Sequence, residues 1–273
     1  MKKSPYIISV FTQHGINYFK PNFIRPDVYG FKMYDYTTAT NEIERNILLK
    51  QGKFPEYRII TNGLFRWDKI KDLSKTTAEK SIFVFFTKRA YLRKIKNLEN
   101  CNYIKEINKI LNNPSLQNIL SKNNIKLKVG IHHSDTEKLN SIIKNKNIII
   151  VQEHDIEQVK QEAVMLLTDY SSMCFEFFLQ NKPVIFYNID DSADCKLYSC
   201  LEDMANPYDG KEQELFNLTK TTEEVCELLV KYIENDFQCE KEILDKEAKF
   251  FYYRNNFCKR FEEFMIEHLN SKK

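Results

Sequence analysis

The amino-acid sequence lacks an excess of charge of either sign. Its 41 Lys and Arg residues against 38 Asp and Glu residues leave a formal net charge of +3. This balance argues neither for nor against nucleic acid, which we do not expect as a partner. It leaves open a local basic face that meets membrane phosphate.

Paired cysteines and long hydrophobic runs are also lacking. The seven cysteines include no CxxC pair, and none joins a spaced histidine in a zinc pattern. Cysteines without such pairing are typical of proteins in a reducing compartment. No apolar run approaches the about 20 residues of a membrane helix, and the run at residues 6–11 is too short for a signal peptide. We therefore expect a cytoplasmic protein, with a peripheral position on the inner face of the cell membrane left open.

The 273 residues, 42% hydrophobic and 29% charged, describe a globular protein with room for one large or two modest α/β domains. Strand-like apolar runs alternate with segments of helical spacing, and this alternation predicts a doubly wound parallel sheet between residues 81 and 187. The expected strands are 6–11, 57–60, 81–86, 125–131, 147–151, 164–167 and 184–187, and the expected helices are 41–51, 105–121, 134–144, 155–162, 173–179, 221–235 and 240–269.

The central stretch, residues 164–191, predicts a strand, a short helix and a second strand. Thr168, Asp169, Ser171 and Ser172 crowd the end of the first strand, and Ser171 or Ser172 is a candidate N-cap. Helical N–H groups without partners, the helix dipole and hydroxyl donors together favour phosphate at such a junction. In the alternative interpretation, the serines only cap the helix and Asp169 only completes a turn.

The length of the pattern favours the functional interpretation. The string LLTDYSSMCFEFFLQNKPVIFYNIDD closely resembles the signature of the CDP-glycerol glycerophosphotransferase family, the teichoic-acid and capsule polymerases. The resemblance implies an α/β fold of GT-B type with two Rossmann-like, doubly wound domains, the N-terminal one short or incomplete. We expect a partial N-terminal domain at residues 1–75, a nucleotide-donor domain at 76–240 and a C-terminal helical segment at 241–273.

The resemblance extends to the first part of the chain. His14, which precedes Gly15, matches the histidine of the family's WHG motif, although Gln13 stands in place of the tryptophan. The resemblance implies that His14 is the catalytic base, work that suits a group titrating near neutral pH. Arg66 lies in a segment that resembles the family's GxPRxD motif. An exposed ion pair of Arg66 with Asp68 is the simpler interpretation.

The resemblance also implies a set of donor-binding residues in the second domain. Arg89 and Thr87 fit a PTxR-like motif, and a guanidinium can grip a diphosphate with paired hydrogen bonds. Either His132 or His133 matches a phosphate-contacting histidine; a metal is the poorer interpretation, because adjacent strand residues face opposite ways and no third ligand is evident. The remaining candidates are Thr168, Ser171 and Ser172 at the diphosphate, Asp169 as a residue that orients the loop or touches the nucleotide, and Asp191 in an acidic turn.

By this resemblance the protein is a transferase. It would move glycerol phosphate or ribitol phosphate from a CDP-activated donor to a hydroxyl of a growing cell-surface polymer, releasing CMP, with no cofactor and no metal. The partners implied are the CDP-polyol donor and a polyol-phosphate or polysaccharide acceptor; a lipid-linked acceptor and a homo-oligomer are left open.

Two alternatives remain. A GT-B sugar transferase would use a nucleotide sugar, since one fold hosts many chemistries. A non-catalytic nucleotide-binding remnant would need a partner chain. The second alternative arises because only thirteen residues precede His14, whereas the family usually has a long stretch there.

Overall fold

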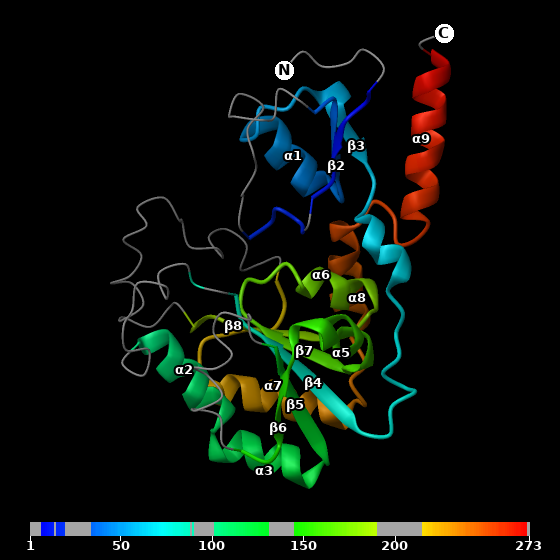
Figure 1. Cartoon of the computed structure of the whole chain (residues 1–273). Coiled ribbons are helices and arrows are strands. Elements are labelled where there is room, and N and C mark those ends of the chain that lie inside the picture. Colours follow the sequence, from blue (N-terminus) through cyan, green and yellow to red (C-terminus); the bar gives the residue numbers. More distant parts are fainter. Residues whose placement is uncertain are drawn as a thin grey trace. The chain divides into compact units, whose positions relative to one another are not determined.

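The computed structural model describes residues 7–13, 15–19, 34–87, 89, 101–130, 145–189 and 215–271 of the chain (Figure 1). It contains two compact units: unit 1 comprises Met1–Ile70 and Lys241–Lys273, and unit 2 comprises Lys71–Glu240. The C-terminal segment, expected as a part of its own, therefore belongs with the N-terminal residues.

Unit 2 is built on a parallel sheet. Its strands, in the described part of the chain, lie in the order β6-β5-β4-β7-β8-β9, and every pairing is parallel. The chain winds outward from β4 in one direction and then from β7 in the other, which is the doubly wound arrangement. This confirms the predicted α/β class. The strands are β4 (Lys80–Phe85), β5 (Ile125–Gly130), β6 (Ile148–Val151), β7 (Met165–Thr168), β8 (Val184–Tyr187) and β9 (Leu218–Thr219).

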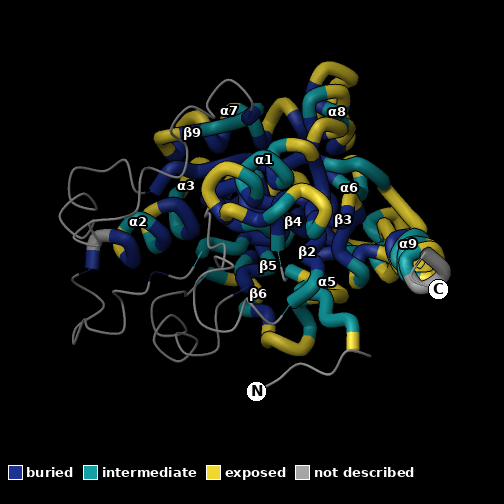
Figure 2. The backbone as a smooth tube through the Cα atoms, turned by 90° about the horizontal axis from the view of Figure 1, so that it is seen from above, coloured by how far each residue is buried: buried dark blue, intermediate teal, exposed yellow. Residues whose placement is uncertain are grey.

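Helices cover both faces of this sheet. Alternate strand residues such as Ile82, Val84 and Leu127 form one core with α2, α3 and α7, while α5 and α6 pack on the opposite face (Figure 1). In Figure 2 the strands are coloured mostly as buried, whereas the helices also carry exposed residues. The helices are α2 (Asn102–Leu111), α3 (Pro114–Lys122), α5 (Ile156–Glu162), α6 (Cys174–Leu179) and α7 (Thr222–Glu234).

The single helix predicted at 105–121 is wrong, because the segment forms two helices. Pro114 has no N–H to continue α2 and begins α3 instead. The side chain of Asn113 caps α3 by accepting a hydrogen bond from Leu116 N at 3.1 Å. The helix predicted at 221–235 is confirmed as α7, which begins with a capping box formed by Thr221 and Glu224.

Unit 1 contains a smaller parallel sheet in its described residues, with the order β1-β2-β3. Helix α1 packs on this sheet around Ala39, Leu48, Phe54 and Ile59. The strand predicted at 6–11 is shorter than expected, since only its last two described residues pair with β2. The elements are β1 (Val10–Phe11), β2 (Tyr36–Ala39), α1 (Glu42–Lys50), β3 (Ile59–Thr61), α8 (Lys241–Glu247) and α9 (Phe257–Ser271), with 3-10 turns at Glu56–Arg58, Phe65–Lys69 and Ala248–Phe250.

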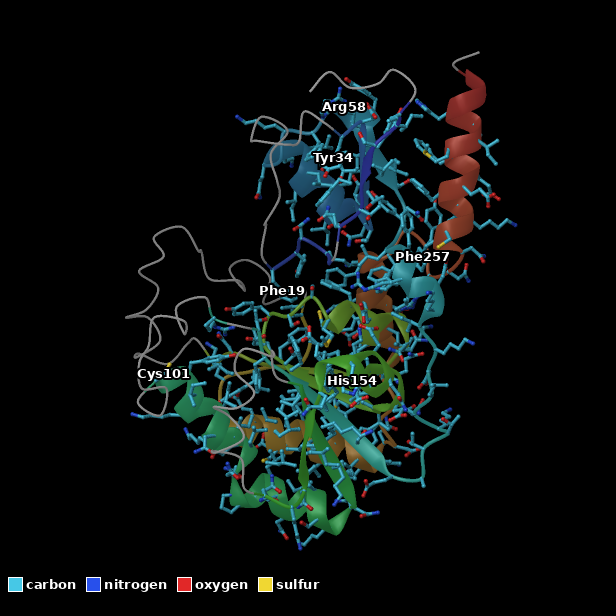
Figure 3. The ribbon with its side chains drawn as sticks, viewed as in Figure 1. Phe19, Tyr34, Arg58, Cys101, His154 and Phe257 are labelled. Atoms are coloured by element: carbon cyan, nitrogen blue, oxygen red, sulfur yellow. The ribbon has the colours of Figure 1, made fainter. Side chains whose placement is uncertain are left out.

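The start of α9 is fastened to the loop that follows β3. The carboxylate of Asp68 accepts hydrogen bonds from the N–H groups of Phe257 and Cys258 at 2.9 and 2.7 Å, and so caps the helix. The ring of Phe257 (labelled in Figure 3) lies against Gly63, where an added Cβ would approach its Cε1 to 2.1 Å. These contacts explain why residues 241–273 belong to unit 1. In the described part of the chain, no helix combines the length and the apolarity needed to cross a membrane.

Glu247, at the end of α8, generates a prediction about stability. It is buried, and among the described residues its Oε2 has no hydrogen-bond partner. Burial raises the pKa of this carboxyl to about 8, against the opposing effect of Arg254. Because the unfolded-state value is about 4.3, the native state holds the proton more tightly. Stability is therefore full below about pH 4 and decreases as pH rises to about 8.

We expect Glu247→Gln to remove this decrease and to be more stable than the wild type at pH 8, by roughly 1–3 kcal/mol. Urea unfolding at pH 5 and pH 8 measures the effect. Glu242→Gln, an exposed carboxylate on the same helix, is the matched control. An unchanged pH dependence in Glu247→Gln would contradict the assignment.

Candidate functional site

Strands β4 and β7 lie side by side at the centre of the sheet in unit 2, with Phe85 paired to Thr168. The chain leaves these two strands in opposite directions, so their carboxyl ends form the topological switch point of the sheet. Open α/β sheets bind ligands in the crevice outside this point. The structure therefore brings together two groups of predicted site residues, Thr87 with Arg89 after β4 and residues 168–172 after β7.

The carboxylate of Asp169 joins the two loops. It is fully buried and accepts hydrogen bonds from Thr87 N at 2.9 and 3.0 Å, from Thr87 Oγ1 at 2.8 Å and from Arg89 Nη1 at 2.7 Å. Such a carboxylate is saturated by donors from the neighbouring loop. Its geometry suits a residue that positions the site more than one that contacts an anionic ligand.

The guanidinium of Arg89, the partner of Asp169, is also buried and hydrogen-bonded within the protein. The side chain of Arg89 is 6% exposed. The ring centroids of Tyr103 and Tyr170 lie 4.6 and 4.3 Å from its Cζ, so both rings make cation–π contacts with the guanidinium. Its Nη1 also donates to Thr87 O at 2.6 Å, an oxygen that accepts a second hydrogen bond from the Tyr103 hydroxyl at 2.8 Å. One end of the guanidinium is thus committed to the protein, and the cation is fixed in orientation at the switch point.

The hydroxyl-bearing residues after β7 take different positions. Thr168 is fully buried and donates from Oγ1 to Phe85 O, across the two central strands. Ser171 is nearly buried and its Oγ accepts from Met173 N at 3.3 Å, whereas Ser172 is partly exposed. Neither serine is the N-cap of α6, contrary to the prediction. Residues 171–175 first make a tight turn, with Cys174 N bonded to Ser171 O, so the helix begins later.

In unit 1, a second buried carboxylate anchors the segment that follows β1. Glu44, on the first turn of α1, is 1% exposed. It accepts hydrogen bonds from Asn17 N at 2.9 Å and from Thr40 N and Oγ1, both at 2.8 Å. Burial raises the pKa of Glu44, and the backbone hydrogen bonds oppose the rise. Residues 16–19, including Phe19 (labelled in Figure 3), are buried as a result.

Glu44 was not among the site residues expected from the sequence, although a local signal was present. Asn41 and Glu44 have the spacing of a capping box, and Asn41 Oδ1 does accept from Glu44 N at 2.8 Å. The helical pattern alone would place Glu44 on a solvated face. Only the fold shows that this face meets residues 15–19.

The remaining predicted site residues are His14, Arg66, His132, His133 and Asp191. His14, His132, His133 and Asp191 lie outside the described residues. Arg66 is exposed on the 3-10 turn Phe65–Lys69 of unit 1, where Asp68 caps α9. Within the described ranges, no three His, Cys, Asp or Glu side chains are grouped to hold a metal ion.

Comparisons with known proteins agree with this arrangement. The family model for CDP-Glycerol:Poly(glycerophosphate) glycerophosphotransferase matches residues 10–259. The minor teichoic acid biosynthesis protein GgaB of Bacillus subtilis (strain 168) is 24% identical over 256 residues, covering 84% of this chain and 27% of GgaB. The chain therefore spans about a quarter of the length of that curated relative.

Solved structures show the same fold. The wall teichoic acid polymerase TagF superposes with a TM-score of 0.62 at 16% identity, over 99% of this chain and 70% of that one. A putative UDP-N-acetylglucosamine 2-epimerase from Listeria monocytogenes gives 0.54 at 15% identity, over 88% and 61%. Both are GT-B folds, which confirms the fold class predicted from the sequence.

The Asp169 network generates a prediction about stability. Asp169→Ala leaves the buried Arg89 cation without its carboxylate and Thr87 N without an acceptor. We expect a loss of roughly 3–5 kcal/mol in the free energy of unfolding, measured by urea denaturation. Asp155→Ala, which removes an exposed aspartate paired only with His154 at 3.4 Å in the described structure, is the control and is expected to cost under about 1 kcal/mol.

A double-mutant cycle separates the ion pair from general loss of packing. Asp169→Ala combined with Arg89→Met is expected to cost less than the sum of the two single variants, because no unpaired charge remains buried. Additive costs would show that the two side chains are not coupled.

Proposed function

This chain belongs to the CDP-glycerol:poly(glycerophosphate) glycerophosphotransferase family, and we propose that it transfers a polyol phosphate from a CDP-activated donor to a hydroxyl of a growing cell-surface polymer. Glycerol phosphate and ribitol phosphate are the groups considered, and CMP is the leaving product. The observation that carries the proposal is the family match over residues 10–259. The clustering of Thr87, Arg89 and residues 168–172 at the switch point of unit 2 supports it.

In the proposed reaction the acceptor hydroxyl attacks the β-phosphorus of the donor. A new P–O bond forms, the bond from that phosphorus to the oxygen of CMP breaks, and the hydroxyl proton passes to a base. We propose His14 as that base. The resemblance of His14 and Gly15 to the family's histidine motif supports this role. The described residues on either side are held in place, since Gln13 donates from Nε2 to Thr38 O at 3.3 Å and Glu44 anchors Asn17. Alignment of the reactants and stabilisation of phosphate charge supply the rest of the catalysis.

The proposed donor site uses fixed polar groups after β4 and β7. Arg89 supplies a preorganised cation, Ser171 and Ser172 supply hydroxyls, and His132 or His133 supplies a further donor. Thr168 and Asp169 are proposed to act by positioning, since their polar atoms already bond to Phe85, Thr87 and Arg89. Arg66, Thr87 and Asp191 remain secondary candidates for contact with substrate.

The names of GgaB and TagF refer to teichoic acid, which supports a polyol-phosphate polymer of the cell envelope as the acceptor. A lipid-linked acceptor, a peripheral position at the membrane and a homo-oligomeric assembly are further parts of the proposal.

One other function is favoured by an observation. The likeness to a UDP-N-acetylglucosamine 2-epimerase favours a nucleotide-sugar donor. The products distinguish the two functions: phosphate-ester transfer releases CMP, and sugar transfer releases a nucleoside diphosphate.

The test is CMP release from CDP-glycerol and CDP-ribitol, with and without a polyol-phosphate acceptor. We expect release that depends on the acceptor and that decreases at least about 100-fold in His14→Ala. His154→Ala is the matched control, because His154 is exposed on unit 2 (Figure 3), with a side chain 79% accessible. Its activity is expected to equal that of the wild type. Full activity in His14→Ala would contradict the assignment of the base.

A further inference from the structure

A hollow lies at the carboxyl edge of the sheet in unit 2. Its volume is about 250 Å³, and it opens between α2, the end of β8 and the start of α7. The polar residues that line it include Glu106 and Lys109 from α2, Tyr187 and Asn188 from β8 and the residue after it, and Lys220 and Glu223 from the region around the N-terminus of α7. None of these residues was singled out in the sequence.

Asn188 points to a ligand in this cavity. Its backbone N–H donates to Thr219 O at 2.8 Å, which fixes the residue between β8 and β9. The residue is only 8% exposed. The residue lines the cavity. Its carboxamide can both donate and accept hydrogen bonds, so it suits a ligand group that does both.

The charges around the cavity are balanced. Lys109 Nζ lies 3.7 Å from Glu106 Oε2. The same oxygen accepts a hydrogen bond from the Tyr187 hydroxyl at 3.4 Å. Lys220 and Glu223 add one further charge of each sign. Burial raises the pKa of Tyr187 to about 12, so its hydroxyl stays a neutral donor. A balanced set of donors and acceptors suits hydroxyl groups, which do both, better than a diphosphate.

The size of the cavity limits what it can hold. Pockets for complete small ligands begin at about 300 Å³, so 250 Å³ is too small for a whole CDP-polyol and large enough for part of one. Neighbouring strands are about 4.8 Å apart, and β8 is the strand next to β7. The cavity is therefore within reach of a substrate whose phosphates lie at the switch point.

We propose that this cavity binds the hydroxyl-bearing polyol portion of a substrate, with the carboxamide of Asn188 as the residue that recognises its hydroxyls. The identity of the substrate rests on the proposed function. The polyol belongs either to the donor or to the acceptor polymer, and the chemistry is the same for both.

The first arm of the test is calorimetric titration of CDP-glycerol and of CDP into the wild type, Asn188→Ala and Asn123→Ala. The control residue Asn123 is exposed at the end of α3, before the amino end of β5. If the cavity holds the donor polyol, Asn188→Ala weakens binding of CDP-glycerol by about 5- to 30-fold and leaves that of CDP unchanged. If it holds the acceptor, donor binding is unchanged and KM for the polyol-phosphate acceptor rises by a similar factor.

Asn188→Asp is a second variant, whose side chain has nearly the size of asparagine but lacks the amide N–H donors. Thermal unfolding of all variants checks that they fold. The proposal is overturned if CDP and CDP-glycerol weaken equally, or if neither donor affinity nor acceptor KM changes more than about 2-fold. A final arm is independent of the proposed function: free ribitol is expected to shift the side-chain amide NMR signal of Asn188 in the wild type. If ribitol shifts this signal but no CDP-polyol binds, the proposed function is overturned and polyol binding in the cavity is supported. If ribitol causes no shift, and both variants use donor and acceptor as the wild type does, polyol binding in the cavity is overturned.

Discussion

The buried carboxylate of Asp169 is the interaction on which the candidate site depends. A parallel sheet brings the carboxyl ends of its strands to one edge, but it does not determine the path of the loops that follow. Asp169 does so by accepting hydrogen bonds from Thr87 and Arg89 at 2.7–3.0 Å. Without that carboxylate the Arg89 cation, enclosed by two tyrosine rings, would lose the counter-charge that Asp169 supplies, which is strongly unfavourable for a buried cation.

Unit 1 uses a similar device. Glu44 is buried at the carboxyl end of β2 and accepts hydrogen bonds from backbone N–H groups of a neighbouring loop, much as Asp169 accepts from Thr87 N. Both carboxylates accept their hydrogen bonds from groups within the protein. They hold loops in place. In the proposed reaction the hydroxyl, guanidinium and imidazole candidates are the groups that meet the anionic substrate, and fixed polar groups reorganise little during phosphoryl transfer.

Local signals explain what could be predicted. The short, strongly apolar runs at β4, β7 and β8 and the helical spacing of residues 41–51 and 221–235 depend on neighbours within a few residues. The corresponding strands and helices all appear in the structure. Where a local signal was overlooked, the prediction failed: Pro114 divides 105–121 into two helices, and a turn at Ser171 delays α6. The partner of Asp169, by contrast, is 82 residues away at Thr87, and no local pattern could reveal it.

The sequence alone therefore determined the parallel α/β class, the order of the strands from β4 to β8 in unit 2, and the family, because hydrophobic periodicity and a long motif are properties of the chain itself. The tertiary structure decided which of the polar candidates already bond to the protein. It placed residues 241–273 with unit 1 through Asp68 and Phe257, and it enclosed Glu44 and Asn188. The physical reason is that burial and hydrogen bonding between distant residues arise only when the strands pair and their ends meet.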